Sequence, residues 1–441
     1  FAEVVRKRVS MQWLGDAAVI LEQHGVSMIT VNGGGVISRL TGMSADGNEE
    51  EGWKVPFAEV VKKRVSIPVA ACGSLRHPDY IDSIIEAGKC DLVALGRQLF
   101  AEPEFCNKIA EGREDELKFC VSCMHCLTKT KFGPNQPGCT VNPRGRREFC
   151  IPRELNVNGD GLPVAVVGAG PAGLEAAVTL AKRGFAVTLF DKGDKLGGNI
   201  NLASMPIGKY KLGWMIGYYE NMLRKLGVTV RLGTTCTPEM LEELKPYAVF
   251  IATGSVEAIP PLPGTGGEGV IPVRSYLCER PEIKDSKVIV LGAGQTGLET
   301  ARMLAVAGNE VTVVDMLPDE IPPITDHRLD LNYAREAGVK ILMAHKVVRI
   351  EDSAVVVTDM ATGEEKSLPR DKVIVALGVK SDHALYDEVK DRFQNVFNLG
   401  DSDKPGMAVY AVSAGYLAAA NLPAKDYVVD EIYFSDIDYR K

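Results

Sequence analysis

The sequence has no apolar stretch of the roughly 18 to 20 residues that a membrane-spanning helix needs, and its first residues lack the apolar core of a signal peptide. It also has no cluster of lysine and arginine interleaved with aromatic residues, and its formal charge is −8, from 50 basic and 58 acidic residues. The run Arg144, Arg146, Arg147 therefore reads as a solvated loop. These absences predict a cytoplasmic protein that acts on small molecules and binds neither nucleic acid nor membranes.

The ten cysteines are not spread as a disulfide framework would be, since four of them lie between positions 120 and 139. Cys120, Cys123, Cys126 and Cys139 form the pattern C-x2-C-x2-C-x12-C. This spacing lets three thiolates from one tight loop and a fourth from a nearby turn converge on a [4Fe–4S] cluster. Tetrahedral zinc is the alternative, although zinc sites usually present two separated C-x2-C pairs. The other six cysteines read as small core residues or inert thiols.

Continuous apolar strands alternate with helices in the first quarter of the chain, which predicts a parallel sheet. We expect strands at 26–31, 67–71 and 91–95, and helices at 57–65 and 78–87. Phosphate-bearing ligands approach the backbone where such strands end in glycine. The glycines that follow the three strands are Gly33 to Gly35, Gly73 and Gly96. Three such units cannot close an eight-stranded barrel by themselves.

The start of the chain is unusual because residues 1–10 nearly repeat residues 57–66, and the first residue is Phe. We interpret this start as non-native, either a fragment or a mis-assembled reading. A solenoid repeat is the alternative, but no third copy follows.

A glycine-rich turn follows an apolar stretch near residue 164. Gly168, Gly170 and Gly173 stand in the spacing G-x-G-x-x-G, and Asp191 ends the next apolar stretch. The glycines permit the turn, admit a pyrophosphate and let helix and strand pack closely, while the carboxylate holds a ribose hydroxyl pair. Because strand, turn, helix and acidic residue occur together, this segment predicts a dinucleotide-binding domain.

The same pattern occurs a second time, with Gly292, Gly294 and Gly297 in the turn and Asp315 at the end of the following strand. Asp315 would accept a hydrogen bond from a ribose 2′-hydroxyl and repel a 2′-phosphate, which favours NADH over NADPH. The alternative is that Asp315 only caps its strand. Two tandem dinucleotide sites suit hydride transfer from nicotinamide to flavin, and the four-cysteine site then suits a one-electron outlet.

These motifs resemble those of the flavin and iron-sulfur oxidoreductases typified by 2,4-dienoyl-CoA reductase and trimethylamine dehydrogenase, whose barrel resembles old yellow enzyme. The resemblance covers the chain from about residue 24. The stretches that carry it are 91–97 with Glu102-Pro103, 120–143, Leu196-Gly-Gly198, Ala252-Thr-Gly254 and Asn398-Leu-Gly-Asp401.

The resemblance implies cofactors for each part of the chain. FAD would be held by Gly168, Gly170, Gly173, Asp191, Gly198 and Asp401; NADH by Gly292, Gly294, Gly297, Glu299 and Asp315; and the FMN phosphate by Gly73, Gly96 and Arg97. The four cysteines would hold the cluster.

The expected organisation is α/β throughout. It consists of a partial TIM-type barrel at 1–118, a small [4Fe–4S] module and linker at 119–160, a discontinuous Rossmann-like FAD domain at 161–280 and 391–441, and a Rossmann-like NADH domain at 281–390.

The resemblance implies that electrons pass from NADH through FAD and the cluster to FMN and then to an α,β-unsaturated substrate of the enoate or enoyl type. Two other functions stay open: an amine dehydrogenase of the trimethylamine type, and an electron-transfer subunit that serves a separate catalytic chain. The family's proton donor belongs to strands absent here, so no catalytic residue is named. Trp53, His77 and Tyr80 are more often packing or surface residues. A homo-oligomer is compatible with the sequence.

Overall fold

The computed structural model of the chain describes residues 11–32, 49–128, 138–318 and 326–423. The near-repeat at 1–10 and Gly33 to Gly35 lie outside these ranges. The chain divides into two compact units, one made of residues 1–123 with 139–145 and the other of residues 124–138 with 146–441.

The first unit contains a three-stranded parallel sheet in the order β1-β2-β3, as expected. The three strands are β1 (Ile29–Val31), β2 (Val69–Cys72) and β3 (Leu92–Ala94). The helices of this unit are α2 (Met11–Gln23), α3 (Val55–Lys62), α4 (Pro78–Glu86), α5 (Arg97–Ala101) and α6 (Phe105–Ala110). Proline begins α4 and stands at the second position of α3, where its missing N–H is tolerated. Both helices bury their apolar faces in one core with the central strand.

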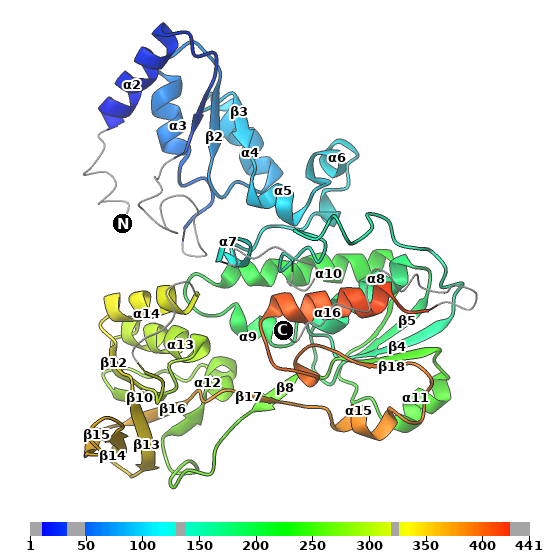
Figure 1. Ribbon diagram of the computed structural model, residues 1–441, viewed down its shortest axis with the longest axis vertical. Coiled ribbons are helices and arrows are strands. Elements are labelled where there is room, and N and C mark those ends of the chain that lie inside the picture. The colour runs from blue at the N-terminus through cyan, green and yellow to red at the C-terminus, as the bar shows by residue number, and fades with distance from the viewer. Residues whose placement is uncertain (1–10, 33–48, 129–137, 319–325, 424–441) are drawn as a thin grey trace. The chain divides into compact units, whose positions relative to one another are not determined.

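The second unit begins with a five-stranded parallel sheet in the order β18-β7-β4-β5-β6. Its strands are β4 (Pro163–Val167), β5 (Ala186–Phe190), β6 (Thr229–Arg231), β7 (Ala248–Ile251) and β18 (Val396–Asn398). Helices α8 (Pro171–Lys182) and α16 (Ala408–Ala420) pack along each other beside this sheet (Figure 1). Strand β18 comes from the end of the chain, so this Rossmann-like domain is discontinuous in sequence.

The second sheet of this unit has the order β12-β11-β10-β16-β9 and is also parallel. Its strands are β9 (Val270–Pro272), β10 (Lys287–Leu291), β11 (Glu310–Val314), β12 (Lys340–Leu342) and β16 (Lys372–Val375). Helices α12 (Val273–Glu279), α13 (Gln295–Val306) and α14 (Asp326–Glu336) accompany it. Strand β9 falls within 161–280, yet it pairs with β16, so the strand order does not follow the boundary expected at residue 281.

Two smaller antiparallel sheets complete the second unit. One consists of β13 (His345–Ile350), β14 (Ala354–Asp359) and β15 (Glu365–Pro369). The other pairs β8 (Ser255–Glu257) with β17 (Val379–Ser381). These two strands carry the chain out of the first Rossmann-like domain and back into it, and Figure 1 shows them between the two domains.

Candidate functional site

The first glycine-rich turn joins β4 to α8 and has the geometry of a pyrophosphate site. Gly168 has φ +111°, and a methyl group there would place its carbon 2.1 Å from the carbonyl oxygen of Ala252. A methyl group on Gly173 would lie 1.9 Å from the Gly168 carbonyl oxygen, so this glycine brings the helix against the turn. Gly170 differs, because nothing lies within 4 Å of a carbon built there. The open space at Gly170 fits the close approach of a ligand phosphate.

The Asp191 carboxylate accepts hydrogen bonds from two backbone groups, one of which lies in this turn. Its Oδ2 atom accepts the N–H of Ala169 at 2.6 Å, and its Oδ1 atom accepts the N–H of Gly193 at 2.7 Å. The segment Leu196-Gly-Gly198 also contacts this turn, since the Gly197 N–H donates to the Ala169 carbonyl at 2.8 Å. A carbon built on Gly198 would lie 3.0 Å from the Gly170 Cα. The structure therefore brings Asp191 and Gly198 to the turn, as expected.

Asp401 reaches the same end of the sheet from the carboxyl-terminal part of the chain. Its neighbour Gly400 packs against Ala172 in the first turn of α8, where an added methyl group would approach the alanine Cβ to 2.9 Å. The Asp401 carboxylate accepts hydrogen bonds from the Ser255 hydroxyl at 3.1 Å and the Gly406 N–H at 2.9 Å. The six residues expected around FAD therefore lie at one end of one sheet.

The second glycine-rich turn, between β10 and α13, repeats this geometry. A methyl group on Gly292, whose φ is +106°, would place its carbon 2.4 Å from the Ala376 carbonyl oxygen. The corresponding carbon on Gly297 would lie 2.0 Å from the Gly292 carbonyl oxygen, whereas Gly294 again faces open space. The structure thus contains two nucleotide-type turns in which the outer glycines are required by the backbone and the middle glycine leaves room.

Asp315 has the same relation to its turn as Asp191 has to the first one. Its Oδ2 atom accepts the N–H of Ala293 at 2.6 Å, and its Oδ1 atom accepts the N–H of Leu317 at 2.8 Å. The carboxylate therefore supports the turn in addition to any bond that it makes to a ribose. Both the binding and the capping interpretations of Asp315 are compatible with this arrangement.

Glu299 lies in α13 and makes an ion pair with a lysine that the sequence analysis did not single out. Its Oε1 atom is 2.8 Å from Nζ of Lys209, which precedes the 3-10 helix η2 (Tyr210–Gly213) in the other Rossmann-like domain. The Glu299 side chain is only 11% exposed. Burial raises the pKa of Glu299, while the charges of Lys209 and Arg302 oppose that shift.

The three residues expected to hold an FMN phosphate follow the strands of the first unit. Gly73 comes after β2 with φ +111°, and Gly96 precedes α5 with open space around a built carbon. Arg97 donates from Nη2 to the Ser74 hydroxyl at 3.2 Å. Lys54, which the sequence does not single out, lies beside Gly73: it is 1% exposed, and a carbon built on Gly73 would lie 2.8 Å from its Cδ.

The cluster cysteines fall in both units. Cys120, Cys123 and Cys139 belong to the first unit, and Cys126 lies in α7 (His125–Thr128) of the second. The Cys123 sulfur is 3.1 Å from the Thr140 hydroxyl. Burial, followed by the charges of Cys123 and Cys120, raises the pKa of the Cys139 thiol. Across the ranges that the structure describes, no group of three or more His, Cys, Asp or Glu side chains is arranged to hold a metal ion. The cluster thus stays a prediction.

Within the first unit, Arg76 ties the backbone at Cys120 to the loop after β2, and it is another residue without a sequence signal. Arg76 is 1% exposed, and its Nε atom donates to the Ser74 carbonyl at 3.0 Å. Its guanidinium also donates to the Cys120 carbonyl and, at 3.3 Å, to the Ser122 hydroxyl. Arg76 therefore connects the loop after β2 to the start of the C-x2-C pattern.

His77 and Tyr80 have partners that explain them without catalysis. The His77 ring bonds to the Glu51 carboxylate, and its centroid is 4.5 Å from that of Phe119. The Tyr80 hydroxyl packs against Gly52, where a built carbon would lie 2.2 Å from it. Burial and then the charge of Glu51 raise the pKa of Tyr80. These contacts are those of packed residues, as expected.

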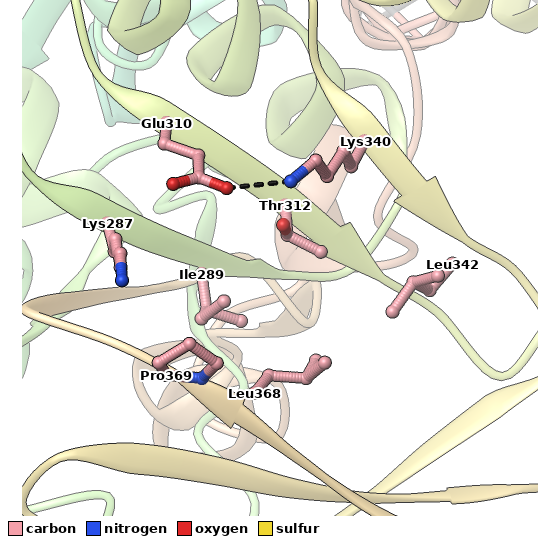
Figure 2. Close-up of a pocket in the computed structure, with 8 residues that line it drawn as sticks. All are labelled: Lys287, Ile289, Glu310, Thr312, Lys340, Leu342, Leu368 and Pro369. Carbon is pink, nitrogen blue, oxygen red and sulfur yellow. Dashed lines mark hydrogen bonds and ion pairs between the residues drawn. The ribbon is translucent and has the colours of Figure 1, made fainter.

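A cavity of about 280 Å³ lies in the second Rossmann-like domain, away from its glycine-rich turn (Figure 2). The cavity is lined by the first residues of three strands: Lys287 of β10, Glu310 of β11 and Lys340 of β12. It therefore lies at the amino ends of these strands. Leu368 of β15 also lines it. Nucleotides bind at the carboxyl ends. Glu310 is also paired with Lys340 at 2.7 Å. This cavity is therefore not the coenzyme site.

Comparison with known proteins agrees with this geometry. Residues 162–395 match the model of the pyridine nucleotide-disulphide oxidoreductase family, which is more than half of the 441-residue chain. The chain belongs to this family. Residues 5–116 match the NADH:flavin oxidoreductase / NADH oxidase family. The pyridine nucleotide-disulphide oxidoreductase part contains both glycine-rich turns, so it is an FAD- and NAD(P)H-binding region, and the preceding part is of the FMN type.

The chain spans about three fifths of the length of the curated relatives described next. NADH oxidase of Thermoanaerobacter brockii is 34% identical over 410 residues, which is 91% of this chain and 62% of that protein. Cinnamate reductase of Clostridium sporogenes is 32% identical over 382 residues, or 85% of this chain and 56% of that protein. A solved complex of 2-naphthoyl-CoA reductase with 2-naphthoyl-CoA aligns with a TM-score of 0.84 at 25% identity, covering 93% of this chain and 62% of that one. The resemblance stated from the motifs is thereby confirmed.

Within the described ranges, no helix is both long enough and apolar enough to cross a bilayer.

Proposed function

We propose that the chain is the electron-transfer part of an NADH-dependent flavin and iron-sulfur oxidoreductase that reduces α,β-unsaturated substrates of the enoate or enoyl type. When bound, the cofactors supply hydride transfer from NADH to FAD, one-electron transfer through a [4Fe–4S] cluster, and reduction of an activated alkene at FMN. The chain's own residues bind and orient these groups.

The observation that carries this proposal is the pair of matching turns in one unit. In each turn an aspartate holds the residue between the first two glycines, and the middle glycine leaves space for a pyrophosphate. The two domains that carry the turns are connected by the β8–β17 pair and by the Lys209–Glu299 ion pair. Two nucleotides held by one framework suit the passage of hydride from one to the other.

The choice of coenzyme and cluster rests on particular side chains. Asp315 follows β11 and bonds the second glycine-rich turn, and a carboxylate at this position would repel the 2′-phosphate of NADPH, which supports NADH. The close spacing of Cys120, Cys123 and Cys126 supports iron-sulfur over zinc, and Cys139 would supply the fourth thiolate. Gly73, Gly96 and Arg97 lie at or just after the carboxyl ends of β2 and β3, where the phosphate of FMN would bind.

The substrate class is proposed from the relatives. A cinnamate reductase and a 2-naphthoyl-CoA reductase are named for conjugated carboxylic or acyl-CoA compounds. A small conjugated acid or thioester is therefore the substrate that we would test first.

A cofactor inventory on anaerobically purified protein tests the proposal. Released flavins are separated by chromatography, and iron, sulfide and zinc are counted per chain. One FAD, one FMN and about four irons with matching sulfide would support the full relay. FAD and iron without FMN would mean that the chain only takes in electrons and that substrate reduction lies elsewhere. Zinc in place of iron would contradict the proposed [4Fe–4S] cluster.

A further inference from the structure

The cavity at the amino ends of β10 to β12 has a largely apolar interior (Figure 2). One face of the parallel sheet lines it, with Ile289 of β10 in register with Thr312 of β11 and Leu342 on the next strand, β12. Leu368 and Pro369 of β15 line it from the antiparallel sheet. Ile289 belongs to a buried core against which Leu342 and Leu368 pack. The cavity therefore continues a hydrophobic core toward the surface.

The charged side chains around this cavity leave one positive charge without a counter-ion. Glu310 and Lys340 are exposed and pair with each other at 2.7 Å, so their charges compensate. Lys287 is exposed and stands in register with Glu310 across the sheet. In the part of the chain that the structure describes, its ammonium group forms no ion pair. Asp371, which does not line the cavity, accepts the backbone N–H of Lys287 at 2.7 Å.

This combination favours a ligand with an apolar body and one negative charge. Apolar cavities hold water poorly, and the empty space costs stability, so a hydrocarbon group gains free energy by filling it. A carboxylate at the mouth would meet the charge of Lys287, whereas an ammonium group would meet two lysines. The volume of about 280 Å³ is at the small end of ligand pockets, which limits the body to a short chain or one ring.

We propose that this cavity binds a small apolar monocarboxylate, with its hydrocarbon body against Ile289, Leu342 and Leu368 and its carboxylate beside Lys287. The glycine-rich turn of the same domain follows the carboxyl end of β10, so this ligand and a dinucleotide would occupy opposite ends of the sheet. The inference goes beyond the proposed function and does not depend on it, because none of the cofactors takes part in this site.

Three probes with the same six-carbon chain test the proposal: hexanoate, hexan-1-ol and hexylammonium. Their binding to the full chain with its cofactors is measured by NMR titration at low ionic strength. The probes are saturated, so none of them is a substrate for alkene reduction. We expect hexanoate to bind about threefold tighter than hexan-1-ol, since an exposed ion pair contributes little, and hexylammonium to bind most weakly. Added salt should reduce the preference for hexanoate.

Two variants separate the apolar and the charged parts of the site. Thr312→Phe places a ring in the cavity and should weaken binding of hexanoate and hexan-1-ol roughly tenfold or more. Lys287→Met keeps an unbranched stem and removes the charge, so it should retain hexan-1-ol binding and lose the preference for hexanoate. Lys346→Met is the matched control, because Lys346 is an exposed lysine of β13 that does not line the cavity.

Each outcome decides the inference. Hexanoate binding that Thr312→Phe removes, together with a preference that Lys287→Met removes, supports it. A parent chain that does not bind hexanoate, or a folded Thr312→Phe protein that binds it equally well, overturns the site. Equal or tighter binding of hexan-1-ol or hexylammonium by the parent overturns the carboxylate. If thermal melts show that Thr312→Phe does not fold, Leu368→Phe fills the same space from β15. A chain without FMN or without a cluster would fail the proposed function and leave this test unchanged.

Discussion

Lys209 and Glu299 form an ion pair of 2.8 Å that joins the two Rossmann-like domains of the second unit. Leu202 and Met205, close before Lys209 in the chain, pack against the core of the other domain, so the pair lies beside an apolar contact. Glu299 was expected to line the NADH site, and the structure places it on α13, whose amino end carries the second glycine-rich turn. The pair therefore couples the position of that turn to the FAD-type domain.

The raised pKa of Glu299 predicts a pH dependence of stability. Because burial raises this pKa, the folded chain binds the proton more tightly than the unfolded chain. The contribution of Glu299 to the free energy of unfolding is therefore present below the ordinary glutamate pKa and is lost as the pH rises through the raised value. The slope in that window is at most about 1.4 kcal/mol per pH unit. Glu299→Gln should remove it, as measured by denaturant unfolding at a series of pH values.

The exposed pair Lys340–Glu310 provides a control of opposite sign. The hydrogen bond from Lys340 lowers the pKa of Glu310. The contribution of Glu310 to the free energy of unfolding is therefore present above the ordinary glutamate pKa and is lost as the pH falls through the lowered value. Glu310→Gln should leave the Glu299 slope in place. A Glu299→Gln protein with the same pH profile as the parent would contradict our account of the domain contact.

The two kinds of glycine in the first turn should respond differently to alanine. Gly168→Ala meets the Ala252 carbonyl at 2.1 Å and forces alanine into a left-handed backbone, which alone costs about 1–2 kcal/mol. We expect loss of folding stability well beyond that figure. Gly170→Ala meets nothing within 4 Å, so it should fold normally but hold FAD poorly. Thermal melts and FAD content measured on both variants separate the two effects, and equal FAD retention by Gly170→Ala and the parent would contradict a pyrophosphate at this turn.

Asp315 should control the choice between coenzymes without a large change in fold. Asp315→Asn keeps an oxygen acceptor for one backbone N–H and removes the charge that repels a 2′-phosphate. The ratio of kcat/KM for NADH to that for NADPH, measured by flavin reduction, should fall roughly tenfold, which corresponds to 1.4 kcal/mol. Asp191→Asn is the matched control: it should reduce FAD content and leave the ratio unchanged. An unchanged ratio in Asp315→Asn would favour the capping interpretation of Asp315.

Removal of one cysteine should distinguish the predicted cluster from scattered thiols. Cys123→Ser should lose the visible absorbance and iron of a cluster, because a four-iron cluster needs its four thiolates, while FAD remains bound. Cys90→Ser is a suitable control, since Cys90 is 2% exposed and belongs to the core around β2. If both variants retain the same iron and sulfide as the parent, Cys123 is not a ligand.

The two nucleotide turns were predictable because each depends on residues close in sequence. Glycines at 168, 170 and 173 and the aspartate at 191 lie within one strand-turn-helix-strand segment, and spacing alone indicates their geometry. Even so, the sequence did not show that Asp191 bonds the backbone of its own turn, because that requires the register between β4 and β5.

The residues that the sequence did not reveal are buried or paired lysines and arginines whose partners lie far away along the chain. Lysine and arginine are mostly surface residues, so nothing in the pattern indicates that Lys54 and Arg76 are each 1% exposed. Arg76 reaches Cys120, and Lys54 reaches Asn32, across loops whose course the periodicity does not predict. Lys209 pairs with a residue 90 positions later, which only the assembled domains reveal.

The β8–β17 pair brings together the two ends of the inserted domain, so that the insert can be exchanged as one segment. Its two ends are hydrogen-bonded neighbours, with Ser255 opposite Ser381 and Glu257 opposite Val379, so the insert enters and leaves at one place. Because the ends meet, everything between Glu257 and Val379 can in principle be replaced by a tight hairpin turn without separating the strands of the parent sheet. Exchange of this one contiguous segment, with both of its junctions in the β8–β17 ribbon, would therefore leave the strands of the first Rossmann-like domain in place.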